Sequence, residues 1–432
     1  MDDLDTYIIN QNPHWTLTPF DTGIKRTRYL EKTAAYLFGT REILIISGVR
    51  RSGKTTLLRQ TIEMLIQEKQ IDANRILFLH CDGAQLSSIE QPLQTVIDRY
   101  KKLTGCTKDI WLFFDEIQNI AGFEQILKNL YDSRDYHIII SGSTSHLLKS
   151  KSGTSLSGRY ISLDVYPLSF SEYLLFKNIQ PPKSAIDAVN RKYQFLHALA
   201  DYMTEGGFPA VVSIDSDAVK ADLLKAYYES IVYRDVISSH KVKNPAMMSG
   251  LLAYLAANTS NPVTYRSLAN IFKSEPLTMQ DYISYAEDGN LLHIVQKFAF
   301  SYKQQLAAPK KVYVIDTSLR FAATFTFSLD MGRLAENVVC VELLRRGFSP
   351  MYFNEKSEID FVVQDKEGCF DLIQVCYAGE IPKREYKGFE EFAQMYPQAK
   401  TRSLILTEDF AGEKDGAKCI PLWSWLLGLE SA

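Results

Sequence analysis

The stretch Ile43-Leu44-Ile45-Ile46-Ser47-Gly48-Val49-Arg50-Arg51-Ser52-Gly53-Lys54-Thr55-Thr56 decides the fold of this chain. It opens on a short, uncharged, aliphatic run, and such a run predicts a fully buried strand. Apolar residues recur at helical spacing after Lys54, so a helix is expected to begin there. The residues between the strand and the helix, 48–55, match the pattern G-x-x-x-x-G-K-[ST].

This pattern, the Walker A motif or P-loop, suits the binding of a nucleoside triphosphate. Glycines let backbone N–H groups turn inward around an anion, and the helix N-terminus adds partial positive charge. Lys54 is expected to reach the β- and γ-phosphates, and Thr55 to offer its hydroxyl to Mg²⁺. A chance glycine-rich turn is the alternative, and the flanking strand and helix argue against it. The candidate ATP-binding residues here are Gly48, Arg50, Arg51, Ser52, Gly53, Lys54, Thr55 and Thr56.

A second buried run, 110–114, ends in the two carboxylates Asp115 and Glu116. Charges at the carboxyl end of a buried strand mark a site in a parallel sheet. As a Walker B segment, Asp115 would hold Mg²⁺ together with Thr55, and Glu116 would be the catalytic residue that polarises the attacking water. The alternative is an exposed acidic turn after a core strand.

Two further segments offer candidate site residues. The expected strand 136–144 ends in small polar residues, and Ser143 or Thr144 would either sense the γ-phosphate or cap the next helix. Arg159, before another expected strand, is a candidate catalytic arginine finger in cis or from a neighbouring subunit; a surface arginine without a catalytic role is the alternative. The pair His80-Cys81 is interpreted as packing residues rather than ligands.

The whole chain has an ordinary composition for a globular protein. It has 432 residues, 46% of them hydrophobic, and a formal net charge of −3, which argues against a uniformly basic nucleic-acid binder. No apolar run reaches the roughly 18–20 residues that span a bilayer, and the acidic start lacks a signal-peptide pattern. The six cysteines show no zinc-like spacing. We therefore expect a cytoplasmic protein without a membrane anchor or structural zinc.

Alternating strands and helices around one P-loop predict a three-layer α/β domain with a parallel sheet over residues 1–215. The acidic strand is one element removed from the P-loop strand, which indicates the ATPase subclass with an extra strand inserted between them. Residues 1–20 are expected to form a loosely structured arm.

Several motifs of the chain resemble those of prokaryotic AAA+-type ATPases similar to the archaeal-ATPase clade. They are Gly-Val-Arg-Arg-Ser-Gly-Lys-Thr-Thr, Phe-Phe-Asp-Glu-Ile-Gln, Ser-Gly-Ser-Thr-Ser, Leu-Ser-Gly-Arg-Tyr, Tyr-Pro-Leu-Ser-Phe-Ser-Glu-Tyr and Gly-Gly-Phe-Pro. The resemblance covers nearly the whole chain. It implies a winged-helix segment followed by a C-terminal domain of unknown function with a nuclease-like fold.

Residues 216–305 fit such a helical or winged-helix domain. The expected recognition helix, 277–288, contains no Lys or Arg, which is a poor start for phosphate contacts. Lys241, Lys243, Lys273 and the pair Lys310-Lys311 could still flank a duplex. DNA binding therefore stays open, and a packing or protein-contact role is favoured.

Residues 306–432 show an order of elements that resembles the restriction-endonuclease-like core. That core carries an acid on one strand and an acid-x-lysine on the next. Asp360 fits the first acid, but Gln374 and Cys376 stand where an acid and the lysine are expected, and Glu336 is a further weak candidate for metal binding. We expect the fold without efficient nuclease activity.

The sequence thus predicts a probable Mg²⁺-dependent ATPase whose nucleotide state controls the attached winged-helix and nuclease-like domains. One alternative is a slow ATP-gated switch or scaffold that acts on a protein partner. Another is an ATP-gated DNA-binding protein or nuclease. Assembly into a homo-oligomer stays open as well, because an arginine finger supplied by a neighbour would require it.

Overall fold

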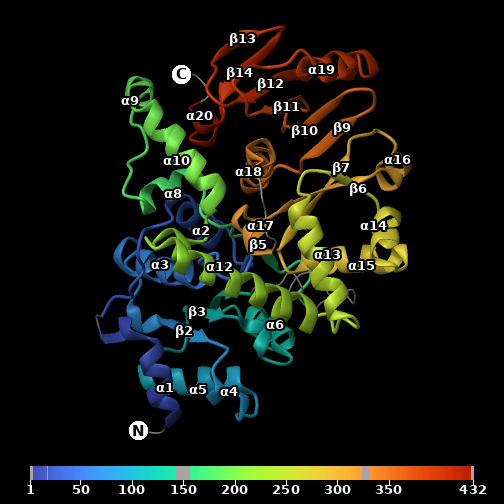
Figure 1. Ribbon diagram of the computed structural model, residues 1–432. Coiled ribbons are helices and arrows are strands. Elements are labelled where there is room, and N and C mark those ends of the chain that lie inside the picture. The colour runs from blue at the N-terminus through green and yellow to red at the C-terminus, as the bar shows by residue number, and fades with distance from the viewer. Residues whose placement is uncertain (1–2, 17, 143–155, 324–329, 430–432) are drawn as a thin grey trace. The chain divides into compact units, whose positions relative to one another are not determined.

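The computed structural model describes residues 3–16, 18–142, 156–323 and 330–429. The chain divides into two compact units, Met1–Val165 and Tyr166–Ala432, which are described separately below (Figure 1).

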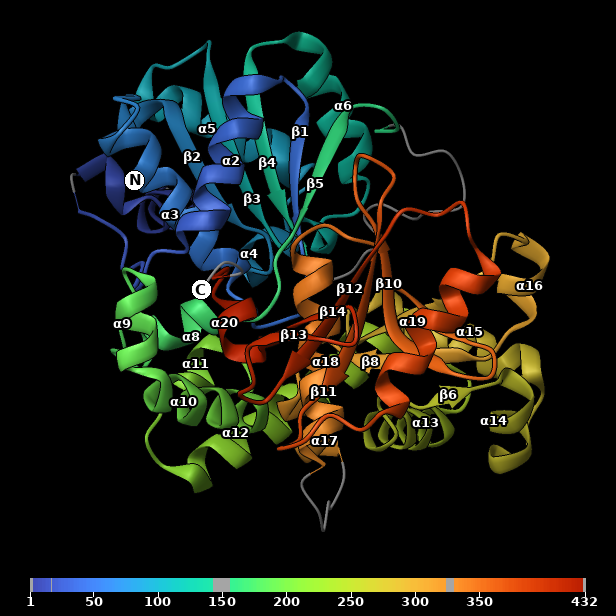
Figure 2. The same ribbon diagram turned by 90° about the horizontal axis from the view of Figure 1, so that it is seen from above.

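Unit 1 is built on a five-stranded parallel sheet with the order β2-β3-β4-β1-β5 (Figure 2). Strand β4 lies between the P-loop strand β1 and the acidic strand β3, which confirms the predicted inserted strand. All carboxyl ends therefore meet at one edge, where ligands bind in open parallel sheets. The strands are β1 (Ile43–Ser47), β2 (Ile76–His80), β3 (Ile110–Asp115), β4 (Tyr136–Ser141) and β5 (Tyr160–Asp164).

Helices cover both faces of this sheet, as the predicted three-layer fold requires. Ile43 and Ile45 of β1 pack in one apolar cluster with α5 and α6, whereas Leu44 and Ile46 pack in another with α2 and α3. This alternation follows from the period of two along a strand. The helices are α2 (Thr27–Gly39), α3 (Lys54–Gln67), α4 (Ala84–Ser87), α5 (Pro92–Thr104) and α6 (Phe123–Ser133).

The N-terminal segment is ordered, and the prediction of a loosely structured arm is wrong. It forms α1 (Asp3–Gln11) and a 3₁₀ turn (Pro13–Thr16). The fully buried Asn12 accepts a hydrogen bond from Phe78 N at 2.7 Å and donates one to Phe78 O at 2.9 Å. The segment thus pairs with the otherwise open edge of strand β2, which its polar composition did not reveal.

Unit 2 begins with helices. Ser169 caps the first helix through a reciprocal capping box with Glu172. The helix after residue 216 continues as a π-helix over Ile231–Ser238. The helices are α8 (Phe170–Phe176), α9 (Ala185–Asn190), α10 (Lys192–Glu205), α11 (Pro209–Val212) and α12 (Asp217–Ser230).

The next segment places two helices between short antiparallel strands. Strand β8 pairs with both β6 and β7. The elements are α13 (Pro245–Ala257), β6 (Pro262–Val263), α14 (Tyr265–Phe272), α15 (Pro276–Asp288), β7 (Leu292–Lys297), α16 (Tyr302–Ala307) and β8 (Lys310–Val314).

The last segment extends the same sheet to nine strands, in the order β13-β14-β12-β11-β10-β9-β7-β8-β6. After residue 316 the sequence predicted a helix, three strands, a helix and a strand, which correspond to α18, β9 to β11, α19 and β12; α17, β13, β14 and α20 are additions. The elements are α17 (Ser318–Ala323), α18 (Met331–Arg345), β9 (Met351–Asn354), β10 (Glu358–Gln364), β11 (Phe370–Cys376), α19 (Arg384–Met395), β12 (Thr401–Thr407), β13 (Gly412–Lys414), β14 (Ala417–Pro421) and α20 (Leu422–Leu426).

The division by contacts differs from the expected domain boundaries near residues 215 and 305. Residues 168–174 belong to the core of unit 2, where Leu168 and Phe170 pack with α18. In addition, strand β7 pairs in parallel with β9, so one sheet runs across the expected boundary near 305. Long-range strand pairing of this kind leaves no mark in the local sequence.

Candidate nucleotide-binding site

The P-loop adopts a backbone that requires its glycines. Gly48 has φ +143°, and a Cβ there would overlap the carbonyl oxygen of Val165. Gly53, at the N-terminus of α3, has φ +97°. The ammonium of Lys54 donates to the carbonyl oxygens of Gly48 at 3.0 Å and Val49 at 3.1 Å. The loop therefore curls around the Lys54 ammonium.

The buried polar atoms of the loop fit an anionic ligand. Ser52 is fully buried, and its hydroxyl has no hydrogen-bond partner among the described residues. Buried hydroxyls are normally paired, so an unpaired one inside a phosphate-binding pattern fits a phosphate oxygen as its acceptor. Thr55 and Asp115 supply a hydroxyl and a carboxylate, which are hard oxygen ligands of the kind Mg²⁺ prefers.

The Asp115 carboxylate contacts side chains from three other elements of unit 1. Its side chain is fully buried at the end of β3. Oδ2 accepts hydrogen bonds from the Thr55 hydroxyl at 2.7 Å and lies 2.9 Å from His80 Nδ1, and Oδ1 accepts one from the Ser141 hydroxyl. Its partners come from α3, β2 and β4, so the edge of the sheet brings them together as expected for a Walker B carboxylate.

These contacts set the charge of the site. Burial raises the pKa of Asp115, but the hydrogen bonds from His80, Ser141 and Thr55 outweigh burial and lower that pKa below its usual value. The hydrogen bond to Asp115 raises the pKa of His80, against the opposing effect of its partial burial. Asp115 is therefore an anion at neutral pH, as a ligand of Mg²⁺ must be.

Glu116 lies directly beyond Asp115 in a left-handed conformation with φ +55°. Its backbone N–H donates to the Ser141 hydroxyl at 3.1 Å, and its carboxylate accepts a hydrogen bond from the Gln118 side chain. A non-glycine residue at positive φ is uncommon and is found preferentially at functional sites.

Three residues in this site were not assigned to it from the sequence. His80, interpreted as packing, contacts Asp115, and Ser141 binds both Asp115 and Glu116. Arg26 is buried and donates to the P-loop carbonyl of Ser52 at 2.9 Å. The polar ends of β2 and β4 were a usable signal for the first two. Nothing in the local sequence marks Arg26.

The structure corrects one part of the interpretation of Arg159. Its carbonyl oxygen accepts from Ile43 N at the start of β1, so Arg159 lies at the amino edge of the sheet, opposite the P-loop. There its side chain pairs with Asp132 at 3.6 Å. A finger acting in cis is therefore wrong, because the length of β1, about 3.3 Å per residue, separates it from the loop. Ser143 and Thr144 lie outside the described residues.

The weak metal candidates of unit 2 take part in a different arrangement. Glu336 and Asp360 both contact the ammonium of Lys311, at 2.9 and 3.3 Å. Gln374 bonds to the Asp360 backbone and to Glu385 instead. Among the described residues, no group of three or more His, Cys, Asp or Glu side chains is placed to hold a metal ion.

The lysines expected to flank DNA are only partly available. Lys241, Lys243 and Lys273 are exposed. Lys310 and Lys311 are buried, and Lys310 donates to carbonyl oxygens of Gln305, Leu306 and Ala308, so the prediction that this pair could flank a duplex is wrong. Their burial follows from their place on β8, the middle strand between β6 and β7.

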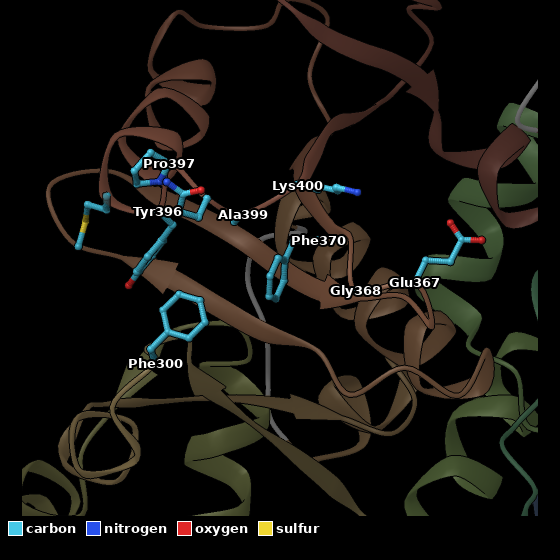
Figure 3. A pocket seen from close by; sticks show the side chains of 10 residues that line it. Phe300, Glu367, Gly368, Phe370, Tyr396, Pro397, Ala399 and Lys400 are labelled. Atoms are coloured by element: carbon cyan, nitrogen blue, oxygen red, sulfur yellow. The ribbon is translucent and has the colours of Figure 1, made fainter.

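A separate pocket of about 530 Å³ opens beside α19 in unit 2 (Figure 3). Its wall is largely apolar, and the rings of Phe300 and Tyr396 meet edge to face at 5.0 Å. It carries only Glu367 and Lys400 as charged lining residues, so it offers no set of groups for acid–base or metal chemistry.

In the part of the chain that the structure describes, no helix is long and apolar enough to cross a membrane.

Three family models match parts of this chain, and several solved structures are similar to it. The family model described as AAA domain matches residues 40–174, and two models of domains of unknown function, DUF8612 and DUF4143, match residues 196–330 and 331–425. A solved structure of the replication initiator DnaA bound to AMPPCP and single-stranded DNA is 16% identical, covers 64% of this chain and 92% of its own, and has a TM-score of 0.29. The Aeropyrum pernix ORC1 protein in complex with DNA is 13% identical, covers 76% and 97%, and has a TM-score of 0.30.

Curated relatives match over nearly the full length. An uncharacterized protein of Haemophilus influenzae is 29% identical over 94% of this chain and 98% of its own length. The uncharacterized protein MJ1544 of Methanocaldococcus jannaschii is 32% identical over 89% of this chain and 88% of its own. The chain therefore belongs to the same family as MJ1544, and its own residues 40–174 match an AAA domain.

Proposed function

We propose that this protein is a Mg²⁺-dependent ATPase whose nucleotide state controls unit 2. The observation that carries the proposal is the convergence of Thr55 and Ser141 on the buried Asp115 carboxylate, beside the curled loop that holds Lys54. That set combines a phosphate cradle, oxygen ligands for a hard cation and a neighbouring acid, Glu116.

Catalysis would rest on positioning and charge neutralisation. Lys54 would contact the phosphates, and Thr55 with Asp115 would hold Mg²⁺, which when bound would neutralise phosphate charge. Glu116 orients the attacking water. Ser141, which donates to the Asp115 carboxylate and accepts from the Glu116 backbone N–H, would link the state of Asp115 to the position of Glu116.

Replacing Glu116 by Gln tests this proposal. The variant should bind ATP like the wild type and lose turnover by about 10²–10³-fold, because it keeps the shape of the side chain but not its charge. Glu31→Gln, the same change at an exposed position of α2, is the matched control and should keep full turnover. Unchanged turnover in Glu116→Gln would remove Glu116 from the mechanism. A wild type without multiple turnover would favour the slow switch or scaffold.

A short connection supports the control of unit 2. Directly before the P-loop, the Ser47 hydroxyl donates to Asp164 at the end of β5, and Val165 N donates to Ser47 O at 2.7 Å. Beyond residue 166 the chain is fixed in unit 2, where Leu168 N donates to Gly207 O at 2.7 Å and Arg345 donates to Pro167 O at 3.2 Å. Along the chain, Tyr166 alone separates these two sets of hydrogen bonds, which supports the proposed control of unit 2.

Two features of unit 2 fit the modules that the sequence suggested. The order α13-β6-α14-α15-β7-α16-β8 fits a winged helix with one added helix, α16, and the order α18-β9-β10-β11-α19-β12 fits a restriction-endonuclease-like core. We assign the first a packing or protein-contact role, since α15 has no basic residue and Lys310 and Lys311 are buried. Fluorescence anisotropy with duplex DNA tests this assignment, and tight binding that weakens with salt would contradict it.

Plasmid nicking with Mg²⁺ or Mn²⁺, abolished by Asp360→Ala, would favour the nuclease alternative.

A further inference from the structure

A cluster in unit 2 joins three carboxylates to one buried ammonium; Asp360 is buried as well, whereas 41% of the Glu358 side chain is exposed. Lys311 Nζ lies 2.9 Å from Glu336 Oε1, 2.5 Å from Glu358 Oε1 and 3.3 Å from Asp360 Oδ1. The Lys311 side chain is 2% exposed. Its three partners come from α18 and β10, while Lys311 itself lies on β8.

The other atoms of the cluster hold the carboxylates in place around the ammonium. The Tyr313 hydroxyl donates to Glu336 Oε1 at 2.6 Å. Val375 N donates to the second oxygen of Asp360 at 2.9 Å, which leaves Oδ1 directed to the lysine. The cluster is therefore an ordered cage of oxygens about a single positive charge.

Carboxylate oxygens are also the ligands that Mg²⁺ and Ca²⁺ bind, at about 2.0–2.6 Å, but here they are arranged around the ammonium and are not placed to hold a metal ion among the described residues. An ammonium accepts the same ligands at hydrogen-bond distance, and unlike a free ion it cannot leave, because it is attached to β8. It also ties the segment that ends at β8 to α18 and β10. A buried carboxylate without a cation is strongly disfavoured in its charged form, so the Lys311 ammonium favours the ionised form of Asp360.

We propose that the Lys311 ammonium takes the place of a divalent cation among Glu336, Glu358 and Asp360. The positive charge of this cluster thus belongs to the protein itself. The Lys311 ammonium joins β8 to α18 and β10 and keeps a catalytic metal ion out of the cage. This inference goes beyond the proposed ATPase function and does not depend on it. It also adds a reason for weak nuclease chemistry that is independent of Gln374 and Cys376.

Mn²⁺ binding to the full-length protein without nucleotide, measured by electron paramagnetic resonance, tests the proposal. The single variant Asp360→Asn should bind the same number of Mn²⁺ ions as the wild type, because no metal occupies the cage. Lys311→Met should gain one Mn²⁺ site at least tenfold tighter than any at the cage in the wild type, and Lys311→Met/Asp360→Asn should lose it. Lys310→Met, which removes a neighbouring buried ammonium bonded only to carbonyls, is the control and should gain no site.

Two results would overturn the proposal. One is Mn²⁺ binding by the wild type that Asp360→Asn abolishes, since the cage would then accept a metal beside Lys311. The other is a folded Lys311→Met protein with no added Mn²⁺ site. If Lys311→Met does not fold, the comparison of the wild type with Asp360→Asn still decides, because it uses only proteins that keep the lysine.

Discussion

The close approach of the P-loop to the end of β5 predicts a large effect of replacing Gly48 by alanine. Gly48 has φ +143°, and the added Cβ would overlap the carbonyl oxygen of Val165 and lie 3.1 Å from its carbonyl carbon. These are backbone atoms, so they cannot rotate away. Val165 is also held by the hydrogen bond from its N–H to Ser47 O at 2.7 Å.

The magnitude has two parts. Positive φ in a non-glycine residue costs roughly 1–2 kcal/mol. Forcing packed backbone apart costs about 1–3 kcal/mol more. Gly48→Ala should therefore lower the free energy of unfolding of unit 1 by about 2–5 kcal/mol. Gly105 separates the two parts, because it has φ +74° but no atom within 4 Å of an added Cβ, so Gly105→Ala should lose only the first part.

Hydrogen exchange of the β1 amides, residues 43–47, in the full-length protein measures how much each variant lowers the free energy of unfolding of unit 1. Each 1.4 kcal/mol is a factor of ten, so Gly48→Ala should reduce protection by roughly 30- to 3,000-fold. Gly105→Ala should reduce protection by roughly 5- to 30-fold. Equal losses of protection in the two variants would refute the close approach of Val165 to the loop.

Two other predictions concern positions away from the motif residues. Arg26→Met should raise the Kd for ATP about tenfold, because the Ser52 carbonyl loses a charged donor worth roughly 1.5–3 kcal/mol. Arg28 is exposed, so Arg28→Met is the control and should leave the Kd unchanged. Calorimetric titration with ATP measures both Kd values. Burial raises the pKa of Glu205, but hydrogen bonds from Lys220 and Lys177 outweigh burial and lower it below 4.5. The stabilising contribution of Glu205 is thus present above about pH 4.5 and is lost as the pH falls through its pKa in the folded protein. Urea unfolding should therefore show Glu205→Gln to be about 1–2 kcal/mol less stable than the wild type at pH 7, and this difference should shrink below pH 4.5. A difference that does not depend on pH would contradict the ion pairing.

The sequence predicted those parts of the site that lie within continuous motifs. Lys54 and Thr55 follow a glycine-rich turn, and Asp115 with Glu116 ends an apolar run, so local pattern and sheet topology were enough to place them. Arg26 contacts the loop only through tertiary packing. No pattern local to residue 26 predicts that contact.

The same limit explains the errors in the wider fold. Asn12 looked like part of a polar arm, yet its amide completes the edge of β2. Lys311 looked like a surface charge, yet strand pairing buries it among carboxylates that come from other elements. Both side chains are polar residues whose partners lie far away in the sequence, and polarity alone predicts exposure.

Hydrogen exchange in unit 2 tests the central claim that nucleotide state reaches beyond unit 1. The Glu116→Gln variant with ATP and Mg²⁺ is compared with the same variant without nucleotide, and the amides of 166–170 and 206–209 are followed. We predict a change in protection at both segments, because Leu168 N bonds to Gly207 O and residue 165 is fixed to the P-loop strand. Lys54→Ala, which loses its phosphate contact, should show no change. Identical exchange with and without nucleotide, in a variant that demonstrably binds ATP, would contradict the control of unit 2 by the P-loop.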